Sequence, residues 1–216
     1  MDNPKYKNGF DFAIHPDALD LPLRWREPRK IFVNSMSDLF HELMPDEYLD
    51  RCFEVMEKAN WHVYQILTKR PERMLRFARR YGKVPDHIWL GVSVELSLYK
   101  PRIDLLRQVG VEIKFISFEP LLGPLDDVNL RGISWAITGG ESGPNHRPIK
   151  REWVRELRDQ CVKQGVAFFF KQWGGKTPKS GGRVLDGRTW NEYPCIGPQF
   201  SEEKRAVVPC MTRQHS

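Results

Sequence analysis

The chain has 216 residues, 40% of them apolar and 12% aromatic, and a formal net charge of +6. Such a chain can bury a sizeable core, and its composition excludes collagen-like, largely disordered and membrane-spanning proteins, since no apolar run approaches a bilayer span. No apolar signal region follows Met1, so we expect a soluble cytoplasmic protein with no membrane partner.

The excess positive charge is concentrated in residues 69–83 and 147–158. Both stretches are mostly helical by pattern, so a solvated outer helix face is the simplest explanation. The alternative is an anionic partner, either nucleic acid or another anionic substrate.

The four cysteines are widely spaced, and none forms the CxxC pair of a zinc ribbon or a redox site. Cys52 and Cys161 fall on apolar helical faces, which predicts packing rather than reactivity. The residues themselves therefore predict no metal and no cofactor.

Residues 1–30 are the least regular part. Residues 10–15 alternate and could form a short strand, and residues 17–25 a turn of helix. From Ile31 onward strands and helices alternate. Strand starts are predicted near residues 31, 62, 88, 113, 133 and 166.

The predicted helices begin at prolines or after a strand loop, and they end at asparagine or glycine. They are 45–60, a helix beginning at Pro71, 101–110, and 150–163 with Gly165 as its cap. Residues 120–132 are rich in proline, glycine and aspartate and are expected to cross over without a full helix.

The distances along the chain between the predicted strand starts are typical of βα units. The right-handed crossovers of such units place consecutive strands side by side and parallel. A flat doubly wound sheet and a curved barrel compete, and a complete eight-stranded barrel typically needs about 250 residues. We predict an α/β fold: a partial (β/α) barrel of about six parallel strands in one domain, 1–194. A hairpin is predicted around Asp186-Gly187, followed by a loosely held tail, 195–216.

Residues 135–144 combine a buried strand with small residues and then a carboxylate and a hydroxyl. Gly139 and Gly140 let the chain turn and let another molecule approach the peptide N–H groups, while Glu141 and Ser142 lie where the strand meets solvent. The alternative is a strand-to-helix turn that only needs flexibility.

The other predicted strands also end in polar residues, so we expect all six to direct polar side chains to one mouth. The mouth residues are Asn34, Ser35, Ser37, Asp38, Thr68, Lys69, Arg70, Ser93, Glu95, Ser117, Glu119, Thr138, Glu141, Ser142, Lys171 and Gln172. Carboxylates and cations around one cavity shift each other's pKa values, which makes an enzyme plausible. No nucleophile–base pair or phosphate loop can be assembled from sequence neighbours.

Each of these residues also has a structural explanation. Asp38 and Glu119 could simply accept backbone N–H groups, and Lys69 could belong to the basic helix face. Lys171 ends an apolar strand, so it must find water, an anion or a carboxylate. Trp173 is interpreted as a core residue rather than a stacking platform.

Several long motifs in fixed order, over about residues 10 to 194, resemble the phage protein family Gp-thirty-seven/Gp-sixty-eight, a family of unknown function. The motifs are FVNSMSDLF at 32–40, QILTKRP at 65–71, WLGVS at 89–93 with Glu95, FISFEPL at 115–121, TGGESG at 138–143 and FFKQWG at 169–174. The resemblance implies a barrel of the radical S-adenosylmethionine type, more remotely similar to spore photoproduct lyase.

The resemblance also implies a three-cysteine motif ahead of the region where this chain begins, holding a four-iron, four-sulfur cluster that binds S-adenosylmethionine. This sequence has no such motif, so we expect an amino-terminally shortened piece of a longer product, or a form without the redox centre. By position, Lys69, Glu95, Glu119 and Lys171 are expected to act as catalytic residues facing the substrate. The residues expected near the cofactor are Ser35, Asp38, Ser93, Gly139, Gly140, Glu141 and Ser142.

Two alternatives stay open. The basic helices and the phage-associated relatives favour a non-catalytic nucleic-acid-binding module. A metal-dependent hydrolase would need Asp38, Glu95, Glu119 or Glu141 to converge.

Overall fold

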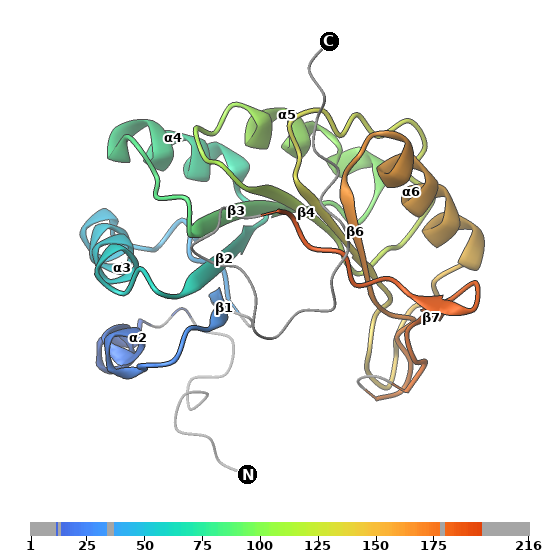
Figure 1. Ribbon diagram of the computed structural model, residues 1–216, viewed down its shortest axis with the longest axis horizontal. Helices are drawn as coiled ribbons and strands as arrows, with labels where there is room; N and C mark the ends of the chain where they lie inside the picture. The colour runs from blue at the N-terminus through green and yellow to red at the C-terminus, as the bar shows by residue number, and fades with distance from the viewer. Residues whose placement is uncertain (1–11, 13, 34–36, 178–179, 196–216) are drawn as a thin grey trace. The chain divides into compact units, whose positions relative to one another are not determined.

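The structure, a computed structural model, describes residues 12, 14–33, 37–177 and 180–195 (Figure 1). It is a mixed α/β fold with a six-stranded parallel sheet, in which the strand order is β1-β2-β3-β4-β5-β6, and a two-stranded hairpin, β7-β8. Because the strands follow one another in chain order, without the reversal that defines a doubly wound sheet, the predicted class of a partial (β/α) barrel is confirmed.

The chain divides into two compact units. The first consists of residues 1–92 and 104–112, and the second of residues 93–103 and 113–216.

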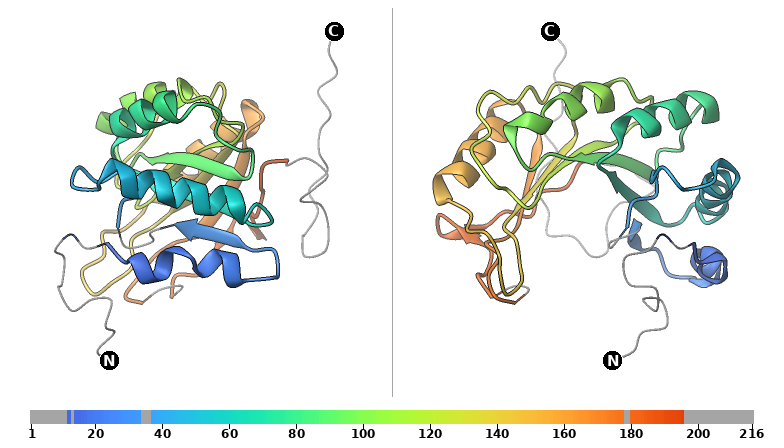
Figure 2. Two further views of the ribbon diagram at one scale, coloured as in Figure 1. Left: turned by 90° about the vertical axis from the view of Figure 1, so that its left-hand side faces the viewer. Right: turned by 180° about the vertical axis from the view of Figure 1, so that it is seen from behind.

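The first unit contains two short helices, three strands and two longer helices. Its elements are α1 (Pro16–Leu19), α2 (Leu21–Arg24), β1 (Lys30–Val33), α3 (Asp46–Lys58), β2 (Val63–Thr68), α4 (Pro71–Tyr81), β3 (Ile88–Ser93) as far as residue 92, and the end of α5 (Pro101–Arg107). Strand β2 pairs in parallel with β1 on one side and β3 on the other. Helices α2 and α3 lie side by side (Figure 2).

Helix α4 shows how the apolar pattern determines packing in this unit. Met74, Leu75, Phe77 and Ala78 are buried, as their three- and four-residue spacing predicts. Phe77 contacts the ring of Phe53 from α3, with 4.5 Å between the ring centroids. The helix therefore packs through the predicted apolar face.

His62 connects the start of the unit to β2. Its Nδ1 accepts a hydrogen bond from the Arg29 N–H at 3.1 Å, which leaves Nε2–H to donate to the Pro22 carbonyl at 3.0 Å. The ring is completely buried, so this histidine has a structural role.

The second unit contains the other three strands of the six-stranded sheet and the two-stranded hairpin. Its elements are the end of β3, η2 (Ser97–Tyr99), the start of α5, β4 (Lys114–Phe118), β5 (Trp135–Gly139), α6 (Arg151–Lys163), β6 (Ala167–Gln172), β7 (Val184–Leu185) and β8 (Arg188–Thr189). Strand β5 pairs in parallel with β4 and with β6, and α6 lies along β5 and β6 (Figure 1).

The hairpin has the turn that its sequence predicts. Asp186 and Gly187 both have positive φ, 52° and 80°, as an Asp-Gly hairpin turn requires. Arg155 and Arg158 of α6 bind the Asp186 carboxylate and hold its pKa at about 2. These two ion pairs thus hold the turn against α6.

Helix boundaries differ from the predictions by one to three residues. Pro45 is the N-cap of α3 and not its first residue, and that helix ends at Lys58, before Asn60. Helix α5 ends at Arg107, before Gly110. The linker 120–132 contains no helix, as predicted. Of the expected strand at 10–15, residues 12, 14 and 15 are described and are not in a strand, whereas residues 10, 11 and 13 and most of the tail lie outside the described residues. No helix of the described residues is long and apolar enough to cross a bilayer.

The first prediction concerns the thiol of Cys161, which is completely buried in α6. Burial raises its pKa to about 12, and only the thiolate is nucleophilic. We expect an alkylating reagent at mildly alkaline pH to leave Cys161 unmodified in the native protein and to modify it in concentrated guanidinium chloride. Peptide mass spectrometry measures the modified fraction, and the exposed Cys195 is the internal control. Native labelling of both at similar rates would contradict the buried position.

Candidate functional site

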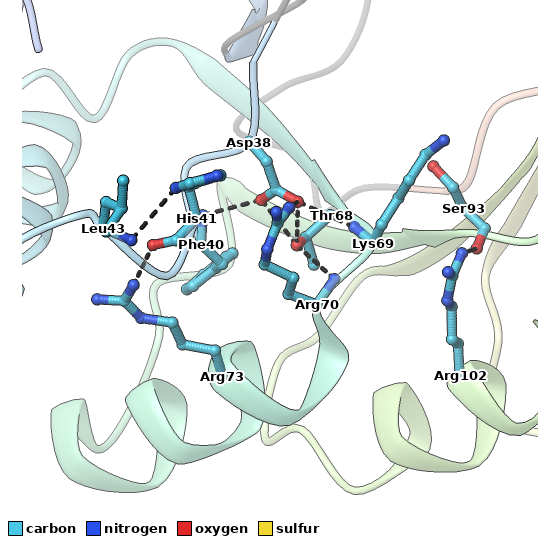
Figure 3. A network of polar contacts seen from close by, with 10 residues as sticks. All are labelled: Asp38, Phe40, His41, Leu43, Thr68, Lys69, Arg70, Arg73, Ser93 and Arg102. Atoms are coloured by element: carbon cyan, nitrogen blue, oxygen red, sulfur yellow. Dashed lines mark hydrogen bonds and ion pairs between the residues drawn. The ribbon is translucent and has the colours of Figure 1, made fainter. Parts of the chain in front are cut away.

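In the first unit, the carboxylate of Asp38 organises the loop after β1. It accepts hydrogen bonds from the Phe40 N–H at 2.9 Å and from the Thr68 hydroxyl at 2.8 Å (Figure 3). It also accepts from the Lys69 N–H at 3.1 Å and from the Arg70 guanidinium at 3.0 Å. Both of its oxygens are used, so Asp38 fastens the loop after β1 to the turn after β2.

The structural explanation of Asp38, as an acceptor of backbone N–H groups, is therefore confirmed. Its place near a cofactor stays a prediction. The side chain of Lys69 is exposed at the same turn, and its role facing a substrate is also untested. Ser35 lies outside the described residues.

The arginines of α4 were predicted to face outward, but Arg73 turns back into the loop that precedes α3. Its guanidinium donates to the carbonyls of His41 and Met44 and pairs with Asp46 at 2.9 Å (Figure 3 shows the contact with His41). Arg80 pairs with Asp50 at 2.7 Å. Part of the basic charge of α4 thus stabilises the unit itself.

In the second unit, a lysine–glutamate pair joins β6 to the end of β4. The ammonium of Lys171 lies 2.9 Å from one carboxylate oxygen of Glu119 and 3.0 Å from the other. The Lys171 side chain is 53% exposed and that of Glu119 is 17% exposed. The sequence predicts that Lys171 contacts water, an anion or a carboxylate, and the structure shows that Glu119 provides the carboxylate. The pair lies between the sheet and solvent.

Gly139, at the end of β5, makes room for this pair. Strand β5 lies between β4 and β6, and a Cβ atom at Gly139 would lie 3.2 Å from the carboxyl carbon of Glu119. That distance is shorter than an ordinary van der Waals contact, so the missing side chain allows Glu119 to reach across toward Lys171.

Glu95 has a different environment, because its side chain is only 6% exposed. The guanidinium of Arg102 lies 3.2 Å from its carboxylate and donates to the Ser93 carbonyl at 2.8 Å (Figure 3 shows the second contact). Arg102 also packs over the ring of Tyr99, 4.1 Å from its centroid. A buried carboxylate needs such a partner, and we missed Arg102 in the sequence although it begins a helix seven residues after Glu95.

Beyond the sheet, residues 140–143 and 172–175 run side by side as an extension of β5 and β6; we call them the paired segments. The Gly140 N–H donates to the Gln172 carbonyl at 2.9 Å, and the Gly175 N–H to the Glu141 carbonyl at 3.0 Å. A Cβ atom at Gly140 would lie 2.1 Å from the Trp173 carbonyl oxygen. The space beside this glycine is therefore filled by the chain itself.

The paired segments also position two polar groups. The Gln172 amide donates to the Ser142 hydroxyl oxygen at 3.0 Å, which leaves the hydroxyl hydrogen available for an acceptor. Arg147 binds Glu141 through its own N–H at 2.8 Å and through its guanidinium at 2.8 and 2.9 Å. These hydrogen bonds lower the pKa of Glu141 to about 2, so it stays ionised and directed at Arg147.

A groove of about 520 Å³ opens beside the paired segments. Its lining residues are His146, Pro148, Ile149, Arg151, Trp173, Gly174, Gly175 and Gly181. No acidic side chain of the described residues lines it. This groove was not predicted from the sequence, and Trp173, which was interpreted as a core residue, is half-buried on its wall.

The described cysteines do not fit the iron–sulfur cluster that the resemblance implies. Cys52 lies on α3 with a pKa raised to about 11 by burial, Cys161 is buried in α6, and Cys195 is exposed. Nowhere in the described part of the chain do three histidine, cysteine or acidic side chains form a group that could hold a metal ion. We derive no chemical step through a cluster.

The structure thus brings the predicted site residues together in four places, three of them between the predicted residues themselves and one through Arg102. They are Asp38 with Lys69 in the first unit, and in the second unit Glu119 with Gly139 and Lys171, and Gly140 with Glu141 and Ser142. Glu95 and Ser93 meet at Arg102. One mouth shared by both units stays a prediction.

Fold and contacts define an α/β protein in which parallel strands carry charged pairs at their carboxyl ends. The chain belongs to a family of proteins of unknown function, DUF5131, whose model matches residues 1–194. No curated protein and no solved structure is similar enough to count as a match.

The second prediction concerns Gly140→Ala. Because the new methyl group would overlap the Trp173 carbonyl oxygen, we expect a loss of about 1–3 kcal/mol in the free energy of unfolding. Denaturant titration measures this change.

Gly110→Ala is the matched control, since a Cβ atom there would meet nothing within 4 Å. We expect it to change stability by less than about 0.5 kcal/mol. Equal effects of the two substitutions would show that the paired segments are not held together by this close contact.

Proposed function

We propose that the second unit is the substrate-binding part of an enzyme and that an anionic substrate binds at the carboxyl ends of β4, β5 and β6. The observation that carries this proposal is the Glu119–Lys171 pair, whose ammonium is half exposed at the end of an otherwise apolar strand. In parallel α/β sheets, this end of the strands is where ligands bind.

The geometry of the pair suits it to hold an anion. An ammonium has three N–H donors, and two suffice for the two oxygens of Glu119 at 2.9 and 3.0 Å. The third donor remains for a carboxylate or phosphate oxygen of a substrate. Glu119 fixes the direction of the ammonium, and Gly139 leaves room for the Glu119 carboxylate.

Lys171 and Glu119 are also suited to proton transfer. A lysine and a carboxylate in hydrogen-bonding contact can exchange a proton with a bound substrate, as general acid and base. Gln172 and Ser142 add a hydroxyl hydrogen donor on the neighbouring segment.

The third prediction tests this site with Lys171→Met, which keeps the length of the side chain and removes its charge. A panel of small carboxylates and phosphates is screened by thermal shift, and the best ligand is titrated by calorimetry. We expect the substitution to weaken binding of that ligand roughly tenfold or more, the value of one charge-assisted hydrogen bond.

The matched control is Lys163→Met at the far end of α6, where the side chain is exposed. It should leave the affinity within about twofold, since rim charges contribute little. A ligand that binds both variants equally, or a panel without any ligand, would contradict an anion site at Lys171.

On the motif resemblance alone, we further propose that the chain is related to radical S-adenosylmethionine enzymes of the phage-associated Gp-thirty-seven/Gp-sixty-eight type. The parallel order of the strands is compatible with that relationship. When bound, S-adenosylmethionine and its cluster would supply the radical, and the residues described here would bind and orient the substrate.

The fourth prediction tests this relationship in the product of the whole gene. If the relationship holds, anaerobic reconstitution with iron and sulfide gives a protein with cluster absorbance, and that protein cleaves S-adenosylmethionine. The measurements are the visible absorption spectrum and the chromatographic yield of cleavage product. A colourless protein that leaves S-adenosylmethionine intact would restrict the proposal to substrate binding.

A further inference from the structure

We infer that the groove beside the paired segments binds a nucleotide, that is, a planar base that carries a phosphate group. This inference goes beyond the proposed function and does not rest on it, because the groove is made by other residues. Its volume of about 520 Å³ is within the usual range of small-molecule sites.

Arg151 carries the positive charge of the groove. Arg102, Arg147, Arg155 and Arg158 of the same unit all pair with carboxylates. The guanidinium of Arg151 instead lies over the Trp173 ring, 5.5 Å from its centroid, and no carboxylate of the described residues pairs with it. A planar guanidinium left in this way matches the paired oxygens of a phosphate.

A second basic group faces the groove. The Nδ1 atom of His146 lies 3.0 Å from the Gly143 carbonyl. Since a carbonyl only accepts, Nδ1 carries the hydrogen in this contact. The other ring nitrogen, Nε2, has no partner among the described residues, and in the neutral ring it is an acceptor, available to a hydroxyl group of a ligand. Arg151 therefore supplies the donors for the phosphate, and His146 adds an acceptor in the same groove.

The Trp173 side of the groove is suited to a flat ring. The indole N–H of Trp173 donates to the Val184 carbonyl at 2.9 Å, and the ring packs against Phe170 with 4.6 Å between centroids. Both contacts fix the orientation of the indole before any ligand binds. Fixed aromatic faces stack on nucleic-acid bases irrespective of their sequence, and Pro148 and Ile149 add apolar surface for a sugar.

The groove and the Glu119–Lys171 pair use different residues at the end of β6. Neither Glu119 nor Lys171 lines the groove. Trp173, which does, packs against the completely buried ring of Phe170, whereas the Lys171 side chain is 53% exposed. The groove is therefore a separate site.

The fifth prediction uses isothermal titration of the full chain with AMP, adenosine and inorganic phosphate. We expect AMP to bind at least roughly tenfold more tightly than adenosine or phosphate alone, because only AMP offers both the ring and the anion. Arg151→Gln should weaken AMP roughly tenfold or more and leave adenosine within about twofold. Arg151 is exposed, and circular dichroism confirms that the variant is folded.

Arg76→Gln, on the exposed face of α4, removes the same charge elsewhere and is the matched control. AMP binding that is absent, that survives Arg151→Gln, or that falls equally in Arg76→Gln overturns the inference. A short single-stranded oligonucleotide distinguishes the two sources of the nucleotide. Binding roughly a hundredfold tighter than AMP, and lost in Arg151→Gln, identifies a nucleic-acid strand, whereas similar affinities identify a free nucleotide.

Discussion

The close contact of two backbones at Gly140 is the constraint on which the second unit depends. With 2.1 Å between a Cβ position there and the Trp173 carbonyl oxygen, no side chain fits. Because of this contact, the pairing of β5 and β6 continues beyond the sheet. The pairing in turn places Ser142 against Gln172 and Trp173 on the wall of the groove. The glycines that suggest a cofactor loop in the sequence are required first by the protein itself.

Charge compensation separates structural from functional groups. Glu95 is buried and bound by Arg102, Glu141 is held by Arg147, and Asp186 is held by two arginines. Such groups have their partners within the protein, and these ion pairs hold the elements that carry them in position. Two groups keep the capacity to bind a ligand: Lys171 has a third N–H donor, and Arg151 pairs with no carboxylate of the residues that the structure describes. An exposed charge is informative where the protein supplies no complete partner for it.

The sequence was sufficient for the strands and for most helices, because buried parallel strands and amphipathic helices leave local periodicity. The turn at Asp186-Gly187 was predictable for the same reason, since its chemistry is local. The contacts between the site residues were not predictable from the sequence. Lys171 and Glu119 are 52 residues apart, and Thr68 and Asp38 are 30 apart, so only the register of the sheet decides that they meet. In the sequence, Arg102 and Arg151 cannot be told from any other surface arginine. Only the structure shows that Arg102 pairs with Glu95 and that Arg151 lies over Trp173.

The residues from 170 to 173 show how one strand end can serve two sites. Lys171 pairs with Glu119, Gln172 binds Ser142, and Trp173 packs against the buried ring of Phe170. The ladder is irregular here, because Thr138 pairs with Phe170 and Gly139 with Gln172. The positive φ of Gly174, 81°, then turns the chain away. A ligand held by Lys171 and a ligand stacked on Trp173 would therefore contact different side chains at the end of the same strand. Each can be tested by a substitution that leaves the other in place, because the two side chains share a backbone but none of the partners described here.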